Sequence, residues 1–306
     1  MGSAMKIKEV LGSVGGKIFY DEPMSQHSSL RVGGRADALI VIESEVQLAQ
    51  IVRKLQPAGI DYLPVGNLTN IIVRDGGYRG AILLMSGLRE INYRQMPDGG
   101  HYINAQGGAA LAQAAALAAA NELTGLEFCS GIPGSIGGAV WMNAGAYGAE
   151  MKDVIEEVSL LDANGLQATM KKEEIVFSYR RTSLPRESII LNARLKLEKG
   201  ERKQIQDKMK EILQARQQKH PLAYPNAGSI FKNIPGMPAG RIIEEMGLKG
   251  KRCGDAEVSV QHANFIINRG KATATDVLSL ISLIADRAKK EKGIDLETEV
   301  EIVGDN

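Results

Sequence analysis

The stretch "GIPGSIGGAVWMNAGAYG", Gly131–Gly148, holds six glycines, one proline and three alanines in eighteen residues and carries no charge. Glycine at this density weakens helices and strands. A chain keeps it where a turn needs a positive φ or where a ligand lies against the backbone. The stretch therefore predicts either a set of tight turns or a surface on which a ligand approaches the main chain.

A second glycine-bearing loop, "PVGNLTNIIVRDGG" (Pro64–Gly77), joins two predicted strands, "YLPV" and "IIV". Its successive backbone N–H groups and polar side chains are able to surround an anion, as in a phosphate-binding nest. It is neither a Rossmann fingerprint nor a Walker motif, because no G-x-G-x-x-G opens a helix and no G-K-[ST] follows. A simple turn between strands is the alternative. The candidate ligand-binding residues are Gly66, Asn67, Leu68, Thr69 and Asn70.

The composition is that of a globular protein without strong charge bias. The chain has 306 residues, which suggests two domains of ordinary size. Lys and Arg number 37 and Asp and Glu 36, so the formal net charge of +1 gives no reason to expect a nucleic acid as partner. The two cysteines, Cys129 and Cys253, show neither a disulfide pattern nor zinc-ligand spacing. We therefore expect a cytoplasmic protein without a metal site.

No segment predicts insertion into a membrane. The most apolar window, "VLSLISLIA" (Val277–Ala285), is much shorter than a membrane span, and the N-terminal segment lacks the apolar core of a signal peptide. Met1–Ala4, "MGSA", is typical of an expression scar and is excluded from the fold prediction.

Short β-branched runs alternate with amphipathic helical patterns, which predicts an α+β fold. The composition changes abruptly at "KGERKQIQDKMKEILQARQQKHP", a charged helix, so we expect a domain boundary near Gly200. The segment 110–125 predicts an alanine-rich helix followed by Gly125, and the segment 275–292 predicts a helix followed by Gly293. Further predictions are a helix over 45–59 and strands over 36–43, 62–65, 70–74, 81–85 and 188–198 and around "NFIIN" and "EVEIV".

Seven motifs occur in order along the chain: "GNLTNIIVRDGG", "GIPGSIGGAVWMNAGAYG", "FSYRR", "NAGSIFKN", "AGRIIEEMGLKG", "HANFIIN" and "ETEVEIVG". Together they resemble the motif series of the UDP-N-acetylenolpyruvoylglucosamine reductase family of bacterial peptidoglycan synthesis. The resemblance implies an α+β flavoprotein with the FAD-binding fold of the vanillyl-alcohol-oxidase type. It implies an FAD-binding domain over 5–200, in lobes of about 5–80 and 81–200, and a substrate-binding domain over 201–306.

The resemblance also implies the ligands. FAD is expected to be bound without a covalent link. NADPH and UDP-N-acetylglucosamine enolpyruvate are expected to use one cleft in turn, and the product is UDP-N-acetylmuramate. The glycine-rich stretch would pass along FAD, because bare backbone lets amide groups approach a diphosphate and a ring. We expect a monomer. The implied FAD contacts beyond the loop Gly66–Asn70 are Gly131, Gly138, Ala139, Asn143 and Gly145.

Reducing an enol ether by hydride requires two kinds of catalytic group. Charge that grows on the substrate carboxylate needs stabilisation, and the adjacent carbon needs a general acid. The resemblance implies that Arg180 of "FSYRR" binds the carboxylate, for which a planar guanidinium is suited. It implies that Ser229 of "NAGSIFKN" donates the proton and that Glu299 stabilises the enolate together with Arg180. Taken alone, such an arginine is more often a surface charge and such a serine a turn or capping residue.

The remaining implied contacts bind the substrate. Lys219 and Asn233 match positions that contact the diphosphate sugar, and Tyr179 is a further candidate. Glutamates at 297, 299 and 301 alternate, which places them on one face of a predicted strand. The longer class of the family inserts a tyrosine-bearing loop after the catalytic arginine. Here "RRTSLPRESIILNARL" runs directly into a strand, so the chain resembles the shorter class and that tyrosine has no counterpart.

Two other functions fit the same fold. An FAD-dependent oxidase for another substrate often tethers FAD through a histidine or cysteine, and His27 and Cys129 lie near the glycine loops. Release of free flavin on denaturation would exclude such a tether. A non-catalytic nucleotide-sugar sensor is the second alternative, although binding alone does not need Arg180, Ser229 and Glu299 together.

Overall fold

The computed structural model describes residues 3–12, 14–97 and 99–306. Of the predicted expression scar, residues 1 and 2 lie outside the described residues, and helix α1 (Ser3–Leu11) begins directly after them. The chain divides into two compact units. The first unit contains the residues up to Phe19, Ala38–Asn67 and Gly80–Arg216, and the second contains Tyr20–Asp37, Leu68–Arg79 and Gln217–Asn306.

This division differs from the prediction of a single domain boundary near Gly200. Most of helix α6 (Arg202–Lys219) belongs to the first unit, whereas two segments from the N-terminal third of the chain belong to the second. Compactness alone does not assign a ligand to either unit. The division into an FAD-binding and a substrate-binding domain therefore stays a prediction.

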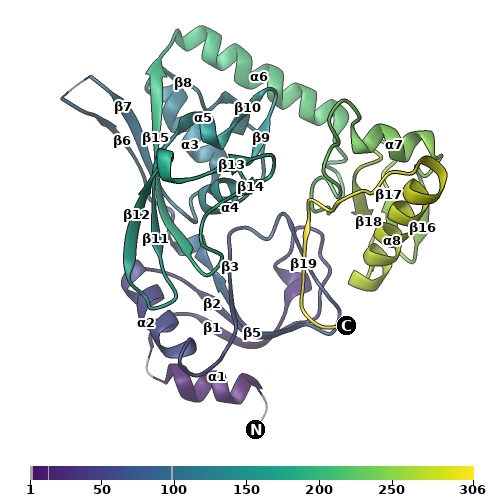
Figure 1. Ribbon diagram of the computed structural model, residues 1–306, viewed down its shortest axis with the longest axis horizontal. Helices are drawn as coiled ribbons and strands as arrows, with labels where there is room; N and C mark the ends of the chain where they lie inside the picture. Colours follow the sequence, from purple (N-terminus) through teal and green to yellow (C-terminus); the bar gives the residue numbers. More distant parts are fainter. Residues whose placement is uncertain (1–2, 13, 98) are drawn as a thin grey trace. The chain divides into compact units, whose positions relative to one another are not determined.

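A six-stranded antiparallel sheet supports the core of the first unit (Figure 1). Its order is β12–β11–β15–β7–β6, and β8 pairs with one end of β15. Helices α3 (Leu111–Ala120), α4 (Ile136–Trp141) and α5 (Met151–Val154) lie to one side of it (Figure 1). The strands are β6 (Ile91–Gln95), β7 (His101–Gln106), β8 (Leu123–Thr124), β11 (Ile155–Leu161), β12 (Gln167–Lys171) and β15 (Ile189–Lys199).

Strand β15 forms where the alternation of the sequence predicts it. From Leu191 to Leu197 the buried residues are every second one, which matches the two-residue period of a strand with one buried face. The chain also contains short hairpins of β9 (Gly145–Ala146) with β10 (Ala149–Glu150) and of β13 (Phe177–Ser178) with β14 (Arg181–Thr182).

A four-stranded sheet has the order β1–β2–β5–β3. Its strands are β1 (Ile18–Pro23), β2 (Arg35–Val41), β3 (Tyr62–Val65) and β5 (Tyr78–Leu84), of which β3 and β5 run parallel. The chain passes from one compact unit to the other within β1, β2 and β5. Helix α2 (Glu45–Leu55) begins at Ser44, whose hydroxyl oxygen accepts a hydrogen bond from the Gln47 N–H at 3.1 Å.

The second unit contains the antiparallel sheet of β16 (Arg252–Cys253), β17 (Ala256–Val258) and β18 (Ile266–Asn268), with α7 (Ala239–Glu245) and α8 (Ala274–Lys292). Helix α8 packs against β16 and β17. Strand β4 (Ile71–Val73) pairs in parallel with β19 (Glu301–Val303). The short 3-10 helices of the chain are η1 (Met24–Gln26), η2 (Met85–Gly87), η3 (Glu127–Cys129) and η4 (Lys172–Glu174).

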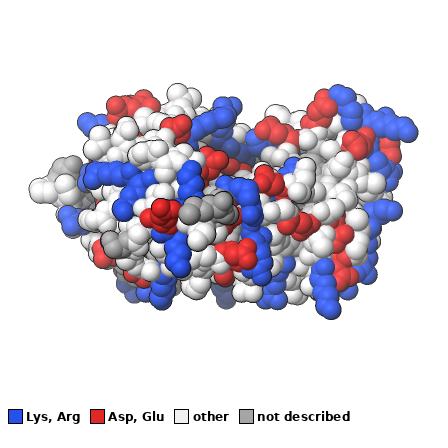
Figure 2. Space-filling view, turned by 90° about the horizontal axis from the view of Figure 1, so that it is seen from below, with Lys and Arg blue, Asp and Glu red and all other residues white. Residues whose placement is uncertain are grey.

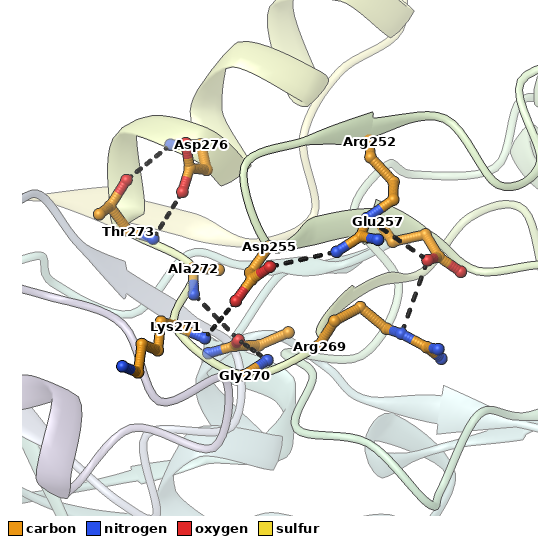
Figure 3. Close-up of polar contacts among 10 residues, drawn as sticks. Arg252, Asp255, Glu257, Arg269, Gly270, Lys271, Ala272, Thr273 and Asp276 are labelled. Atoms are coloured by element: carbon orange, nitrogen blue, oxygen red, sulfur yellow. Dashed lines mark hydrogen bonds and ion pairs between the residues drawn. The ribbon is translucent and has the colours of Figure 1, made fainter.

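The start of α8 shows why the predicted C-terminal helix forms there. The Thr273 hydroxyl accepts from the Asp276 N–H at 3.1 Å, and the Asp276 carboxylate accepts from the Thr273 N–H at 2.9 Å (Figure 3). The helix ends at the predicted glycine, because Gly293 takes the left-handed conformation with φ +67°.

Two predictions of extent were wrong. Helix α3 ends at Ala120 instead of before Gly125, because Glu122 takes φ +58° and the next two residues pair with β15 as β8. The glutamates at 297, 299 and 301 do not share a strand face. Only Glu301 lies in β19, while the Glu299 N–H donates to the carbonyl oxygen of Ile230.

Lys and Arg side chains are interspersed with Asp and Glu on the face drawn in Figure 2, as the near-zero net charge leads one to expect. Across the part of the chain that the structure describes, no helix has both the length and the apolar character needed to cross a membrane.

Candidate active site

The glycine-rich stretch and the loop at Gly66 meet in the first unit. Ser135 caps α4, and its hydroxyl oxygen accepts from the Gly138 N–H at 3.3 Å. A Cβ atom on Gly66 would lie 2.1 Å from that hydroxyl oxygen, so only glycine allows this approach. Two segments that are far apart in the sequence, and that both carry predicted FAD contacts, therefore lie side by side.

Gly138 differs from Gly66 in what surrounds it. A Cβ atom at Gly138 would make an ordinary contact with the Ser135 hydroxyl, at 3.5 Å, and Gly138 is exposed. The next residue, Ala139, is 4% exposed and packs in the hydrophobic core. The start of α4 thus combines an exposed glycine with apolar side chains that are buried in the core of the first unit.

Gly131 has φ +77° and packs beneath α6, where a Cβ atom would lie 2.9 Å from Leu213 and 3.1 Å from Arg216. Burial lowers the pKa of the Arg216 guanidinium. The Nε atom of Arg216 and the hydroxyl of Ser130 are buried and have no hydrogen-bond partner among the described residues. Buried polar atoms usually have partners, so these two atoms fit a site that receives a polar ligand.

Asn143 is fully buried and has φ +45°. Its side-chain nitrogen donates to the Glu150 carboxylate at 2.8 Å and to the Ser178 carbonyl oxygen at 3.1 Å, and its side-chain oxygen accepts from the Lys152 N–H at 3.0 Å. These three hydrogen bonds of the Asn143 carboxamide are made to the protein's own loops. The carboxamide thereby joins the β9–β10 hairpin to the β13–β14 hairpin.

Tyr179 and Arg180 form the two-residue tip of the β13–β14 hairpin. Arg180 has φ +56° whereas Tyr179 has a negative φ, so the positive φ is at the second tip residue, as in a type II turn. Its guanidinium donates to the carbonyl oxygen of Gly145 at 3.1 Å and lies 5.0 Å from the centre of the Tyr179 ring. The neighbouring Thr182 hydroxyl donates to the Trp141 carbonyl oxygen at 2.9 Å. These two hydrogen bonds attach the β13–β14 hairpin to the glycine-rich stretch.

The loop after Gly66 continues into the second unit. Leu68 has φ +50°, and its carbonyl oxygen accepts from the N–H and the hydroxyl of Ser29, each at 3.2 Å. The side-chain nitrogen of Asn70 donates to the Glu299 carbonyl oxygen at 3.0 Å. The Asn70 carbonyl oxygen accepts from the Glu301 N–H at 3.0 Å. These bonds attach the last residue of the loop to the C-terminal segment.

Ser229 and Glu299 are anchored to the same residue of the second unit. Ile230 directly follows Ser229, and its carbonyl oxygen accepts from the Glu299 N–H at 2.8 Å. Before Ser229, the Gly228 N–H donates to the Asn226 side-chain oxygen at 3.0 Å. Ser229 and Glu299 are both partly exposed, so the structure brings two predicted catalytic residues together at a surface.

The two predicted substrate-binding residues of the second unit have different surroundings. Lys219 is exposed at the last position of α6. Asn233 lies before α7, and its side-chain oxygen accepts from the Ala239 N–H at 3.0 Å. Asn233 therefore also helps to cap α7, a structural role that the sequence did not predict.

The motif "HANFIIN" is one of the seven that carry the family resemblance, but no binding or catalytic role was predicted for its residues. The structure shows Asn264 of this motif, 3% exposed, bonded to Phe231 at 3.0 and 2.8 Å. No local sequence pattern predicts that Asn264 and Phe231 are hydrogen-bonded to each other. The described residues contain no group of three or more His, Cys, Asp or Glu side chains arranged to hold a metal ion.

The fold and these loops match a known cofactor-binding domain. Residues 36–171 match the model of an FAD binding domain. A solved structure of the BBE-like 1 protein of Physcomitrella patens shares the fold, with 18% identity, a TM-score of 0.50, and coverage of 63% of this chain and 44% of that one. The predicted α+β, FAD-binding fold is confirmed, and the protein is an FAD-binding oxidoreductase.

Two closer comparisons cover nearly the whole chain. A reductase of Syntrophus aciditrophicus is 48% identical over 98% of this chain and 96% of its own length and is named UDP-N-acetylenolpyruvoylglucosamine reductase. A solved Thermus caldophilus structure of the same enzyme is 34% identical, with a TM-score of 0.79 over 94% of this chain and 98% of that one. Residues 220–303 match the model of the UDP-N-acetylenolpyruvoylglucosamine reductase C-terminal domain. The chain belongs to the UDP-N-acetylenolpyruvoylglucosamine reductase family.

Proposed function

We propose that this protein reduces UDP-N-acetylglucosamine enolpyruvate to UDP-N-acetylmuramate in peptidoglycan synthesis, with NADPH as the source of electrons. The name of the relative that is 48% identical supports the proposal. The structural observation that supports it is the hydrogen bond from the Glu299 N–H to the Ile230 carbonyl oxygen, because it joins the backbone of the predicted stabilising residue to the segment of the predicted proton donor, Ser229.

Several of the proposed FAD contacts lie in the first unit. There Gly138 is exposed, and buried polar atoms of Ser130 and Arg216 lack partners among the described residues. When bound, FAD supplies the hydride that the terminal carbon of the enolpyruvyl group accepts. We assign its binding to the backbone of Gly66–Asn70, Gly131, Gly138, Ala139, Asn143 and Gly145.

The proposal assigns the substrate carboxylate to Arg180. As the terminal carbon accepts a hydride, the π electrons of the double bond move toward the carbon that bears the carboxylate, and negative charge grows on the carboxylate oxygens. A planar guanidinium offers two parallel N–H donors to such a group. The bond from Arg180 to the Gly145 carbonyl oxygen, at 3.1 Å, limits the positions that the guanidinium takes.

Ser229 completes the reaction by donating its hydroxyl proton to the carbon next to the carboxylate. One hydride and one proton have then been added across the double bond, and the serine regains a proton from solvent. Glu299 assists Arg180 in stabilising the enolate.

Lys219, Asn233 and Tyr179 are the proposed contacts of the diphosphate sugar. Lys219 is exposed at the end of α6, and Tyr179 is 48% exposed at the hairpin tip. Each is thus accessible to a ligand. Because UDP-sugars and NADPH are cytoplasmic metabolites, we place the reaction in the cytoplasm. We also propose that the protein is a monomer.

The surroundings of the two candidate tethers support non-covalent FAD. Cys129 is fully buried, and burial raises the pKa of its thiol, so little of the reactive thiolate is present. The His27 ring nitrogen Nε2 lies 2.7 Å from the Glu22 carboxylate. A covalent FAD that stays with the denatured protein would favour the oxidase alternative.

A steady-state assay tests the proposed function. The FAD-loaded protein is mixed with NADPH and UDP-N-acetylglucosamine enolpyruvate, and the products are identified by mass spectrometry. We expect NADPH oxidation that depends on the enolpyruvyl substrate, and a product heavier than the substrate by one hydride and one proton. Oxidation of NADPH without that product would contradict the proposal.

A further inference from the structure

Asn264 holds the dipeptide that follows Ser229. Its side-chain oxygen accepts from the Phe231 N–H at 3.0 Å, and its side-chain nitrogen donates to the Phe231 carbonyl oxygen at 2.8 Å. The Asn264 backbone oxygen accepts from the Ile230 N–H at 2.9 Å. A single buried asparagine thus makes three hydrogen bonds to Ile230 and Phe231, which are each 1% exposed.

The same dipeptide also holds the segment of Glu299. The Ile230 carbonyl oxygen accepts from the Glu299 N–H at 2.8 Å, and Phe231 forms an isolated β-bridge with Thr298. Ile230 and Phe231 therefore connect three segments: the one that carries Ser229, the one that carries Glu299, and the turn that carries Asn264.

The turn before Asn264 fixes the direction of its side chain. The Asn264 N–H donates to the His262 ring nitrogen Nδ1 at 3.2 Å, and the Phe265 N–H donates to the His262 carbonyl oxygen at 3.0 Å. The Ser259 N–H donates to the Phe265 carbonyl oxygen at 2.8 Å. The carboxamide is thus held in place before any ligand arrives, as a supporting residue has to be.

We infer that Asn264 is a positioning residue that sets the Ser229 hydroxyl relative to the Glu299 carboxyl group by fixing the Ile230–Phe231 backbone between them. The inference rests on the proposed function. A carboxamide supplies both the donor and the acceptor that the Phe231 peptide groups need, whereas a carboxylate supplies acceptors alone. An aspartate at this place would keep the acceptor but put an oxygen against the Phe231 carbonyl oxygen, and would shift the dipeptide.

Asn268 provides a matched control. It is also 3% exposed in the second unit, and its side-chain oxygen accepts from the Gly270 N–H at 2.8 Å and the Ala272 N–H at 3.1 Å, in the loop drawn in Figure 3. Its side-chain nitrogen donates to the Leu30 carbonyl oxygen at 3.1 Å. Asn268 is thus a buried, multiply bonded asparagine whose side-chain hydrogen bonds go to residues other than Ile230 and Phe231.

The test compares Asn264→Asp and Asn268→Asp with the wild-type holoenzyme in anaerobic stopped-flow experiments. Reduction of the flavin by NADPH and its reoxidation by the enolpyruvyl substrate are measured separately. For Asn264→Asp we expect reduction within about threefold of wild type and reoxidation slower by roughly tenfold to a hundredfold, the effect of a misplacement near 1 Å. The solvent deuterium isotope effect on reoxidation should rise. Asn268→Asp should keep the wild-type ratio of the two rates.

Asn264→Gln is measured beside the aspartate variant in case the latter does not fold. Glutamine keeps the donor and the acceptor but places them one methylene further out, so the same selective loss is expected. Equal losses in both half-reactions, or the same ratio of rates in the Asn264 and Asn268 variants, would overturn the inference. If the wild-type flavin is reduced by NADPH but not reoxidised by the substrate, the proposed function fails first and the inference fails with it.

Discussion

The side-chain nitrogen of Asn70 donates to the backbone oxygen of Glu299 at 3.0 Å, across 229 residues of sequence. The loop that starts at Gly66 is therefore tied to the segment of a predicted catalytic glutamate. Asn70 was predicted as an FAD contact, and the structure shows that its side chain also has this structural bond. The predicted FAD-binding loop and the segment of Glu299 are thus joined by this hydrogen bond and by the parallel pairing of β4 with β19.

Arg180→Lys is expected to lower the rate of flavin reoxidation by the enolpyruvyl substrate by roughly 10²–10³, the loss seen when one preorganised donor to a developing anion is removed. Lysine keeps the charge but lacks the planar pair of N–H donors. Arg181→Lys is the control, because Arg181 is the exposed neighbour in β14. Stopped-flow reoxidation measures both variants. A normal rate in Arg180→Lys with a loss in Arg181→Lys would reverse the assignment.

Asn143→Ala is expected to lower the free energy of unfolding by about 1–3 kcal/mol, because it leaves the partly buried Lys152 N–H without its acceptor and removes one hydrogen bond between the glycine-rich stretch and the β13–β14 hairpin. Asn143→Asp should be worse at neutral pH, since its carboxylate would face that of Glu150. Urea denaturation of the holoenzyme measures both changes. Unchanged stability in both variants would show that these bonds contribute nothing.

Gly66→Ala is expected to purify with less FAD and to bind added FAD more weakly. The new Cβ atom would lie 2.1 Å from the Ser135 hydroxyl oxygen and 2.9 Å from its Cβ, and Ser135 is buried as the cap of α4. Such overpacking typically costs ~1–3 kcal/mol. Gly15→Ala is the control, because no atom lies within 4 Å of its added Cβ. The FAD content of both variants is measured as flavin absorbance per mole of protein. Full FAD content in Gly66→Ala would refute the packing argument.

Asp75 is expected to make stability depend on pH. Burial acts to raise the pKa of its carboxyl group, but hydrogen bonds from the Thr275 hydroxyl, the Thr275 N–H and the Ala274 N–H outweigh it and lower that pKa. A lowered folded-state pKa stabilises the fold above the unfolded value of about 3.9, and this contribution is lost as the pH falls through the folded pKa.

Comparison with Asp75→Asn isolates this contribution. The difference in urea midpoint between wild type and Asp75→Asn should be largest near neutral pH and should shrink as the pH falls below about 4. A difference that stays constant over this range would mean that the carboxylate form of Asp75 does not stabilise the start of α8.

Local signals predicted the elements whose ends are fixed by neighbouring residues. Helix α8 was expected over 275–292 and is observed at Ala274–Lys292, and it ends at the C-terminal glycine that the sequence predicts. Helix α3 and the C-terminal strand were misjudged because pairing with distant segments decides where they end. The short β8 pairs with β15, and the Glu299 N–H is used by Ile230.

The site shows the same limit. Motifs supplied the residue types and the candidate roles of Arg180, Ser229 and Glu299. The hydrogen-bond partners around the site were not predicted, because these bonds join residues that are far apart in the sequence. Asn264 bonds to Phe231 across 33 residues, and Arg180 bonds to Gly145 across 35. Asn143 was assigned to FAD from its place in a motif, whereas its side chain is used by three protein partners.

The proposed function is tested most directly by an anaerobic experiment in two steps with the wild-type holoenzyme. NADPH is added first, and the yellow flavin absorbance should disappear. UDP-N-acetylglucosamine enolpyruvate is added next, in an amount equal to the flavin. We expect the absorbance to return in full and UDP-N-acetylmuramate to form in the same amount. Flavin that stays bleached after the second addition would contradict the proposed function.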